Sequence, residues 1–564
     1  MDLFSTCSRL GLLLFFFWTS CPLLQAQSWQ AATALSTAAG EASDISDLVA
    51  DGAGGYVVAG TFTGALTLGG VTLTSLGGQD IFVARFNTAG VCTQAVSAGG
   101  TGYEWKPVLA LDPDGTVVVA GTFGSPSITF GATTLVKTGA IGSSSRDLFV
   151  AKLSPTGLWS QAVRAGGTND DTVNDLAVDA NGTATVVGSF TGGAITFGSR
   201  ALSSPSSSGA LFVARLNSAG IWTQAVGAQS SGAPFYASGV ALEANGNAVV
   251  CGYYFGSSLT LGSFQLTSFA TTTAFVARLS NTGQWTQASQ ATISRGFAFA
   301  DAIAVDGAGN AAITGSFQES NVSFGTYTLT YNGPTNGTAN DNLFVARLNS
   351  AGIWTQAAQA TGSDNSFPAA LVLDNGGNVF VAGQFKSPSI SFGNTVLTNT
   401  NTSAQAPTFD VFLARLNNAG IWNYAIAGGG QGSEYATALR LTSSGAQVAG
   451  TFGPSPAAFG PITLTTGASY AGFIASLGGG ALGNKMATSA PAVLAPNPAK
   501  TQATLSLVAA PDARSALLLD ALGRSVRTYA LPARATAVPL DLTGLAPGLY
   551  VVRCGAAAGR LVVE

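Results

Sequence analysis

The sequence has no histidine and is poor in charged residues. Histidine is the commonest general base and transition-metal ligand, so its absence argues against many catalytic and metal sites. Charged residues make up 9% of the 564 residues, and the formal net charge is −4. This balance gives no electrostatic reason to expect nucleic acid or an anionic membrane surface as a partner.

Cysteine is also scarce. Of the five cysteines, Cys7 and Cys21 lie in the N-terminal leader, which leaves Cys92, Cys251 and Cys554. An odd number of widely spaced cysteines supports neither a disulfide framework nor a thiolate metal site. We therefore expect no metal and no cofactor.

Hydrophobic residues, by contrast, make up 46% of the chain, and there are 72 glycines. High hydrophobicity with low charge argues against disorder. The length suits one large domain and a small one.

The first residues have the form of a secretory signal. Arg9 precedes an apolar run from Leu10 to Trp18, and Ala26 supplies a small residue for cleavage. This pattern predicts a signal peptide over residues 1–26. The run is below the roughly 18 residues of a membrane span, and no later segment reads as one, so we expect no transmembrane segment after cleavage. A lipidated Cys21 is a weaker alternative, because Trp18-Thr-Ser precedes it.

Three landmarks recur seven times in the body of the chain. The first is an aliphatic segment with a glycine-rich turn, such as LAVDANG at 176–182, and the second is a segment ending in Gly and Phe. The third is FVARL or a variant, at intervals of 67, 63, 63, 69, 68 and 61 residues. A WTQA-like segment follows only six copies, and its counterpart, SWQAA at 28–32, begins the mature chain.

These repeats fit four-stranded antiparallel blades. If the first strand of the mature chain completes the last blade, a ring of seven closes and no sheet edge is left open. We therefore predict an all-β chain with a seven-bladed β-propeller over residues 27–478, closed by the N-terminal strand.

Repeated polar and aromatic residues have structural interpretations. The acids of the first turn, exemplified by Asp112 and Asp306, are expected to hydrogen-bond the turn backbone rather than bind metal. The cation of the third landmark, such as Arg278, is expected to pair with or cover the next blade. Tryptophans such as Trp222 are expected to pack between blades.

The predicted topology places two uniform turns of each blade on one face and two variable links on the other. Function usually resides on variable loops that a rigid scaffold holds. Aromatic residues with scattered carboxylates suit glycan or peptide binding; alternatively, they only plug the mouth of the central channel. The candidate ligand-binding residues are Tyr103, Glu104, Trp105, Asp170, Asp171, Phe235, Tyr236, Phe297, Phe367, Glu434 and Tyr435.

Two segments of the body, DLFVAKL at 147–153 and IAVDGAGN at 303–310, carry a family resemblance. Residues 28–478 resemble the bacterial seven-bladed β-propeller repeat family (SBBP-like). The resemblance implies the fold and a cell-envelope setting, and it implies no reaction and no catalytic residues.

A small-residue linker over 479–492 leads to a C-terminal domain over 493–564. Its motifs are Pro496-Asn497-Pro498, a D-x-x-G-R containing Gly523, an L-x-x-G-L-Y containing Gly548 and Tyr550, and an apolar last strand. They resemble the C-terminal sorting domain of type IX secretion cargo, although Arg560 stands where that family usually has Lys. The resemblance implies a small Ig-like β-sandwich, recognition by the type IX machinery, and a surface or extracellular location in a Bacteroidetes-type host.

Three functions remain open from the sequence. The favoured one is a non-enzymatic binding or adhesion module for an extracellular glycan or protein. The second is a glycan hydrolase or lyase that uses Glu104, Asp170, Asp171 or Glu434 as acid and base. The third is a structural envelope component.

Overall fold

The computed structural model describes residues 28–138, 145–204, 209–230, 233–333, 340–401, 403, 407–443, 445–478, 493–506, 514–519, 525–554 and 557–564. These residues form strands and turns with no helix among them, which confirms the all-β prediction. The predicted signal peptide and linker lie outside the described residues. The chain divides into two compact units, Met1–Gly480 and Ala481–Glu564, which are treated separately below.

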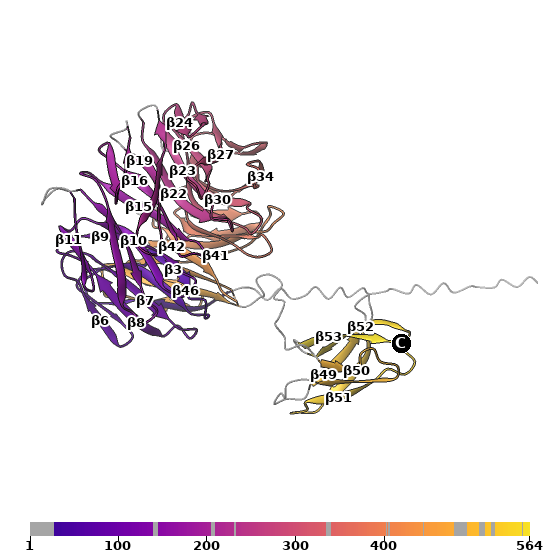
Figure 1. The fold of residues 1–564 in the computed structure, drawn as a ribbon. Helices are drawn as coiled ribbons and strands as arrows, with labels where there is room; N and C mark the ends of the chain where they lie inside the picture. The colour runs from indigo at the N-terminus through magenta and orange to yellow at the C-terminus, as the bar shows by residue number, and fades with distance from the viewer. Residues whose placement is uncertain are drawn as a thin grey trace, which may run out of the picture. The chain divides into compact units, whose positions relative to one another are not determined.

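In the described part of the first unit, the strands form seven antiparallel groups of four neighbours, each called a sheet below; a single parallel pair between β26 and β29 joins the fourth group to the fifth. We number them in chain order and give their strands from the innermost outward (Figure 1). They are β3 (Asp47–Ala50), β4 (Tyr56–Phe62), β7 (Asp80–Phe86) and β8 (Cys92–Ala98); β9 (Glu104–Leu111), β10 (Val117–Phe123), β13 (Asp147–Leu153) and β14 (Trp159–Ala165); β15 (Asp171–Val178), β16 (Ala184–Phe190), β19 (Ala210–Leu216) and β20 (Trp222–Gly227); β22 (Phe235–Leu242), β23 (Ala248–Phe255), β26 (Thr272–Leu279) and β27 (Trp285–Gln290); β29 (Phe297–Val305), β30 (Ala311–Gln318), β33 (Asn342–Leu348) and β34 (Trp354–Gln359); β36 (Ser366–Leu373), β37 (Val379–Phe385), β40 (Asp410–Leu416) and β41 (Trp422–Gly430); and β42 (Glu434–Leu441), β43 (Ala446–Phe452), β46 (Ala471–Gly478) and β1 (Ser28–Ala34).

The landmarks of the repeat map onto these strands. The aliphatic segment forms the innermost strand, the Gly-Phe segment the second, the FVARL segment the third and the tryptophan segment the outermost. The acid of the first turn does cap the turn, as predicted: Asp306 Oδ1 accepts the backbone N–H groups of Ala308 and Asn310, both at 2.9 Å. Gly309 supplies the positive φ, 79°, that this turn requires.

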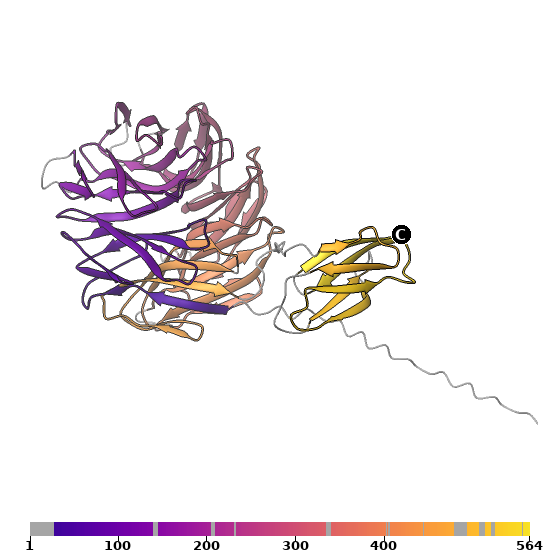
Figure 2. The ribbon, with the colours of Figure 1, turned by 60° about the horizontal axis from the view of Figure 1, so that its bottom comes forward.

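The seven sheets follow one another in a cycle. The innermost strand of each sheet contacts that of the next, and β3 of the first sheet contacts β42 of the seventh. Figures 1 and 2 show the indigo strands of the first sheet beside the orange strands of the last. The expected N-terminal closure is present, because β1 pairs antiparallel with β46 from Ser28–Gly478 to Ala34–Phe473.

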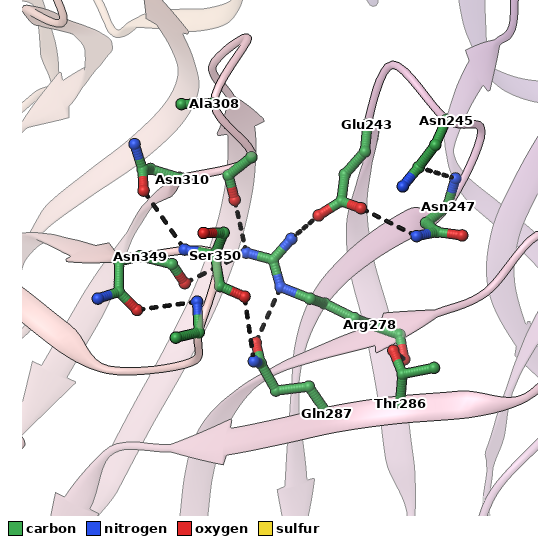
Figure 3. Close-up of polar contacts among 12 residues, drawn as sticks. Glu243, Asn245, Asn247, Arg278, Thr286, Gln287, Ala308, Asn310, Asn349 and Ser350 are labelled. Atoms are coloured by element: carbon green, nitrogen blue, oxygen red, sulfur yellow. Dashed lines mark hydrogen bonds and ion pairs between the residues drawn. The ribbon is translucent and has the colours of Figure 1, made fainter.

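At four boundaries the recurring cation joins a sheet to the next one, and Figure 3 shows the contact that Arg278 makes. Arg278 donates from Nη2 to the carbonyl of Gly309, in the first turn of the following sheet, at 2.7 Å, and it forms an ion pair with Glu243. Arg85, Arg215 and Arg347 reach the corresponding glycine carbonyls at 2.6, 2.8 and 2.5 Å. The predicted contact with the next repeat is therefore made by side-chain hydrogen bonds.

The closing boundary uses a different arginine. The seventh sheet has Ser476 at the position of the cation, and Arg440 of β42 takes over the contact. Arg440 Nη1 donates to the carbonyl of Gly55 at 3.1 Å, and its guanidinium lies 4.9 Å from the centre of the Tyr56 ring. Gln447 connects Arg440 to Ser476 through hydrogen bonds of 2.6 and 2.9 Å.

Three tryptophans, Trp29, Trp285 and Trp422, join the outer strands of neighbouring sheets through the indole N–H, whereas the buried Nε1 atoms of Trp159 and Trp222 have no partner among the described residues. Trp29 Nε1 donates to the carbonyl of Ala427 at 2.8 Å, and Trp422 Nε1 donates to that of Gln359 at 2.9 Å. The second and third strands are linked by a small hairpin that covers the tryptophan; Trp29 packs edge-on against Phe459 of such a hairpin at 5.3 Å. The hairpins are β5 (Ala65–Leu68) and β6 (Val71–Thr74), β11 (Ser127–Phe130) and β12 (Thr133–Val136), β17 (Ala194–Phe197) and β18 (Arg200–Ser203), β24 (Ser258–Leu261) and β25 (Phe264–Thr267), β31 (Val322–Phe324) and β32 (Tyr327–Leu329), β38 (Ser389–Phe392) and β39 (Thr395–Thr398), and β44 (Ala457–Phe459) and β45 (Ile462–Leu464).

The second unit consists of two sheets that share one core. One contains β47 (Val493–Ala495), β48 (Gln502–Ser506) and β51 (Ala537–Asp541); the other contains β50 (Ser525–Leu531), β49 (Arg514–Leu519), β52 (Gly548–Cys554) and β53 (Ala557–Val563). Leu505 and Leu540 of the first sheet pack in the same cluster as Leu518, Val552 and Leu561 of the second. Two layers around one apolar core are the simplest stable all-β arrangement.

We expect Trp29→Ala to lower the free energy of unfolding of the first unit by about 3–5 kcal/mol, because a buried indole and its hydrogen bond at the closing strand are lost. Tryptophan fluorescence during urea unfolding measures this. The matched variant Gln30→Ala changes an exposed residue of the same strand and is expected to stay within about 0.5 kcal/mol. Equal effects of the two substitutions would contradict the role of Trp29.

Candidate functional site

The variable links lie together on one face of the first unit. The second strand of each sheet ends, and the third begins, at the edge where the innermost strand starts; for example, Phe123 pairs with both Glu104 and Asp147. Both variable links of each sheet therefore meet at this edge. We call this side of the sheets the link face.

The candidate ligand-binding residues fall into two groups on this face. Tyr103 and Tyr435 are exposed, at 54% and 38%. Partly exposed side chains belong to Trp105, Asp170, Tyr236, Phe297 and Phe367. The side chains of Glu104, Asp171, Phe235 and Glu434 are fully buried at 0% exposure, so they have no open surface with which to contact a ligand. A binding role for the first group stays a prediction.

A cavity of about 580 Å³ opens among the innermost strands on the link face. Every one of the seven sheets contributes to its lining, from Ser46 in the first to Thr437 in the seventh. Its most distinctive lining residues are Asp44, Gln79, Trp105, Lys106, Asn174, Tyr253 and Asp301. This volume lies within the range of small-ligand sites.

The cavity lining depends on a β-bulge in the innermost strands. The pairing shifts by one residue at Asn174, Ser238, Asp301 and equivalent positions of other sheets. The extra residue leaves the ladder and its side chain is re-aimed. Asn174 Nδ2 donates to the carbonyl of Ala237 at 2.7 Å, and Thr437 Oγ1 donates to that of Ile45 at 2.5 Å, so two of these residues also connect adjacent sheets.

Charges in the cavity are mostly carboxylates. Burial raises the pKa of Asp301 to about 7, Asp341 raises it further, and Lys106 opposes the shift. Burial likewise raises the pKa of Asp47 to about 6 and that of Asp175 to about 7, although both accept backbone hydrogen bonds. Lys106 lies close enough to lower all three pKa values. The cavity therefore offers both a positively charged hydrogen-bond donor, Lys106, and carboxyl groups such as that of Asp301.

Lys106 stands out by its backbone as well. Its φ is 46°, in the left-handed region, and it precedes Pro107 within the bulge of β9. A non-glycine residue in this region is strained, and such strain clusters at functional sites. Lys106 is exposed at the cavity, and among the described residues it forms no ion pair.

Aromatic side chains form three groups on the link face. Tyr103 stacks on Trp105 at 6.0 Å, and the Arg146 guanidinium lies 5.3 Å from the indole centre. The second group contains Tyr236, Tyr253 and Phe299; the Tyr253 ring centre lies 5.3 Å from that of Tyr236 and 4.9 Å from that of Phe299. The third group joins Phe367, Phe409 and Tyr435 at 6.0 and 5.6 Å. Flat apolar faces next to polar groups can bind a sugar ring or an aromatic side chain.

The described residues hold no group of three or more Asp, Glu or Cys that could bind a metal ion. Cys92, Cys251 and Cys554 are free thiols, and burial raises the pKa of Cys251 well above its ordinary value. No helix in the described part of the chain has the length and apolarity required to cross a membrane.

Residues 493–563 match the family described as "Secretion system C-terminal sorting domain". The second unit is therefore a type IX sorting domain, and the chain is a protein exported to the cell surface or the extracellular space. In it, Asn497 Oδ1 accepts the backbone N–H of Val562 at 2.9 Å, and the Tyr550 hydroxyl donates to the carbonyl of Ala546 at 2.9 Å. Gly523 lies outside the described residues.

No curated protein matches the chain. Among solved structures, the chain is similar to a protein of unknown function from Dyadobacter fermentans DSM 18053, at 11% identity and a TM-score of 0.34, over 66% of this chain and 94% of that one. It is also similar to a fungal alcohol oxidase in complex with copper, at 12% identity and a TM-score of 0.40, over 96% of this chain and 100% of that one. A third similar structure is the polysaccharide lyase Uly1, at 9% identity and a TM-score of 0.37, over 74% of this chain and 88% of that one. Likenesses this distant carry no conclusion about function.

Sequence reasoning missed Lys106, Asn174, Tyr253 and Asp301. The strict alternation of a strand places every second residue on one face, and a bulge breaks that rule at a position that the sequence does not mark. The proline after Lys106 was the one local signal, because proline is confined to edges and bulges of sheets.

We expect Lys106→Gly to raise the free energy of unfolding by up to about 1 kcal/mol, because glycine adopts a positive φ without a Cβ penalty. Lys106→Ala keeps the strain and is expected to change it by less than about 0.5 kcal/mol. Thermal unfolding of the two variants and the native chain measures the difference. A destabilised Lys106→Gly variant would show that the bulge is not strained.

Proposed function

We propose that the first unit is a seven-bladed β-propeller over residues 27–478, preceded by a signal peptide over 1–26. Seven four-stranded sheets, the cyclic contacts of their innermost strands and the β1–β46 pairing support this proposal. A linker over 479–492 then leads to an Ig-like sorting domain over 493–564 that the type IX machinery recognises.

We further propose that this propeller is a non-enzymatic binding module for an extracellular carbohydrate. The observation that carries the proposal is the cavity of about 580 Å³, with Trp105 and Tyr253 in its lining and polar side chains around them. Aromatic faces stack on sugar rings, and carboxylate, amide and hydroxyl groups accept and donate hydrogen bonds to hydroxyls. A site of this size fits one or two sugar rings.

The hydrolase or lyase alternative has support from a different acid than the sequence suggested. Glu104, Asp171 and Glu434 are buried, whereas Asp301 lines the cavity, and burial raises its pKa to about 7, as suits a general acid. Turnover of a bound glycan that Asp301→Asn abolishes would establish this alternative. A purely structural envelope role predicts no saturable ligand at all.

We expect Trp105→Ala to weaken binding of a glycan identified on an array by about tenfold or more, because a central aromatic residue carries a large share of binding energy. Calorimetry with the purified mature chain measures the affinity. Ile221→Ala, an exposed residue of the turn on the opposite face, is the control and is expected to leave the affinity unchanged. Equal affinity of the Trp105→Ala variant would place the ligand elsewhere.

Removing residues 493–564 is expected to leave the chain in the periplasm, because the sorting domain is the part that the secretion machinery recognises. Cell fractionation with an antibody against the first unit measures the location. Surface exposure of the truncated chain, at the level of the full chain, would show that another segment directs export.

A further inference from the structure

Three of the seven boundaries between sheets contain a buried carboxyl group from each side. The first member opens the third strand of one sheet, and the second opens the innermost strand of the next sheet. All six side chains are at most 1% exposed. The pairs are Asp80 with Glu104, Asp147 with Asp171, and Asp410 with Glu434.

The three pairs share one construction, in which each carboxyl has an oxygen that backbone N–H groups satisfy. Leu76 N–H donates to Asp80 Oδ2 at 2.8 Å, and Thr400 N–H donates to Asp410 Oδ2 at 2.7 Å. On the other side, Gly430 N–H donates to Glu434 Oε2 at 3.0 Å. The corresponding donors of the remaining acids are Gly100 for Glu104, Thr138 for Asp147 and Gly167 for Asp171.

The second oxygens of these groups are buried without a donor. Among the described residues, no donor lies within hydrogen-bond distance of Asp80 Oδ1, Asp147 Oδ1, Asp171 Oδ1, Asp410 Oδ1 or Glu434 Oε1. Glu104 differs, because its Oε1 accepts the Ser125 hydroxyl, and its carboxyl also hydrogen-bonds that of Asp80. An unsatisfied buried oxygen is costly, and the other two boundaries each contain two of them, one from each acid.

A glycine makes room for the first acid of each pair. A Cβ at Gly99, Gly166 or Gly429 would lie 2.0, 2.4 or 2.3 Å from the Cγ of Asp80, Asp147 or Asp410. The other four boundaries have no such acid pair, and the residue at the glycine position is Ser36, Gln229, Thr292 or Thr361. The first acid, the glycine that makes room for it and the second acid thus occur together or not at all. This joint occurrence indicates that the three residues form one structural feature.

Few charged groups surround the pairs. Arg164 binds Asp147 at 2.7 Å, and Asp170, paired with Arg146 at 3.0 Å, lies beside Asp171. Within the described residues, no ion pair reaches Asp80, Glu104, Asp410 or Glu434. Each pair also has fewer than the three acidic side chains of a typical carboxylate metal cluster, and its oxygens are closed to solvent. A proton is the partner that fits this space.

We propose that each of the three pairs shares one proton, and that these three boundaries are therefore sealed at acidic and neutral pH and weakened in alkali. Two buried carboxyls that repel each other electrostatically cannot readily ionise together. The proposal concerns the scaffold and does not depend on the proposed ligand.

The electrostatics of the second acids agree with this. The pKa values of Glu104, Asp171 and Glu434 are each raised to about 8, chiefly by burial and in part by the partner acids Asp80, Asp147 and Asp410. A carboxyl with a raised pKa is protonated in the folded chain and ionised in the unfolded chain between these two pKa values. Stability is thus greatest below the ordinary carboxyl pKa of about 4, and it falls as the pH rises toward 8.

The three boundaries that contain acid pairs lie directly under the link face. Tyr103 directly precedes Glu104 and Tyr435 directly follows Glu434, so an exposed tyrosine adjoins each of these buried acids where a variable link meets the innermost strand. Ionising both members of a pair would push the two sheets apart at the base of these links. The face that carries the aromatic groups would then loosen before the whole unit unfolds.

The test is the melting temperature of the mature full-length chain from pH 5 to pH 10, read by tryptophan fluorescence. All tryptophans after the leader lie in the first unit, so the signal reports that unit alone. We expect the melting temperature to fall by about 5 °C or more between pH 6 and pH 9.5. In the triple variant Glu104→Gln, Asp171→Asn, Glu434→Gln, the amides donate to the partner carboxylates at any pH, so the fall is expected to be less than half as large.

The matched control is Asp364→Asn. Asp364 lies in the corresponding link of the boundary where neutral Asn342 and Ser366 replace the acid pair, and the variant is expected to keep the native pH dependence.

Equal pH dependence of the native chain and the triple variant would overturn the proposal, as would a native chain whose melting does not depend on pH. Stabilisation by calcium and destabilisation by a chelator would overturn it too, because a cation would then fill the pairs. Should the triple variant not fold, a weaker protonated-carboxyl infrared band in Glu434→Gln than in the native chain at pH 7 supports the proposal, and a band of unchanged intensity overturns it.

Discussion

The antiparallel pairing of β1 with β46 is the contact on which the first unit depends, because it joins the two ends of a long run of repeats. Without β1, the N–H and C=O groups of β46 would form an open sheet edge, which is a site for aggregation. With it, the seventh sheet has four strands like the others, and β42 can contact β3. Arg440 completes the closure at the boundary where the repeat lacks its usual cation.

Once the cycle is closed, the same few kinds of contact recur at several of its boundaries. A side chain of the third strand reaches the turn of the next sheet, and an outer tryptophan reaches back to the previous one, as Arg278 and Trp422 show. Each contact is modest, since an intramolecular hydrogen bond contributes about 1 kcal/mol net. Their repetition around the cycle gives a rigid frame, and a rigid frame leaves the link face free to vary in sequence.

Acidic side chains near the link face lie in two different environments. Asp301 lies at the cavity and can contact a ligand, whereas Glu434, on an equivalent strand, is enclosed between two sheets. The difference arises from position along the strand: the bulge residue is turned toward the cavity, and the residue three places earlier is turned toward the neighbouring sheet. A carboxylate in the first position is open to the cavity, and one in the second position is enclosed between sheets.

The sequence by itself determined the all-β class, the strand order within each repeat, the displaced first strand, the turn-capping acids such as Asp306 and the sorting domain. These features depend on local patterns: alternation, turn chemistry and a fixed period. The tertiary structure alone decided that Glu104, Asp171 and Glu434 are buried and that Lys106 and Asp301 line a cavity. Burial depends on which neighbouring sheet a side chain meets, and a bulge reverses the alternation from which its direction would be predicted.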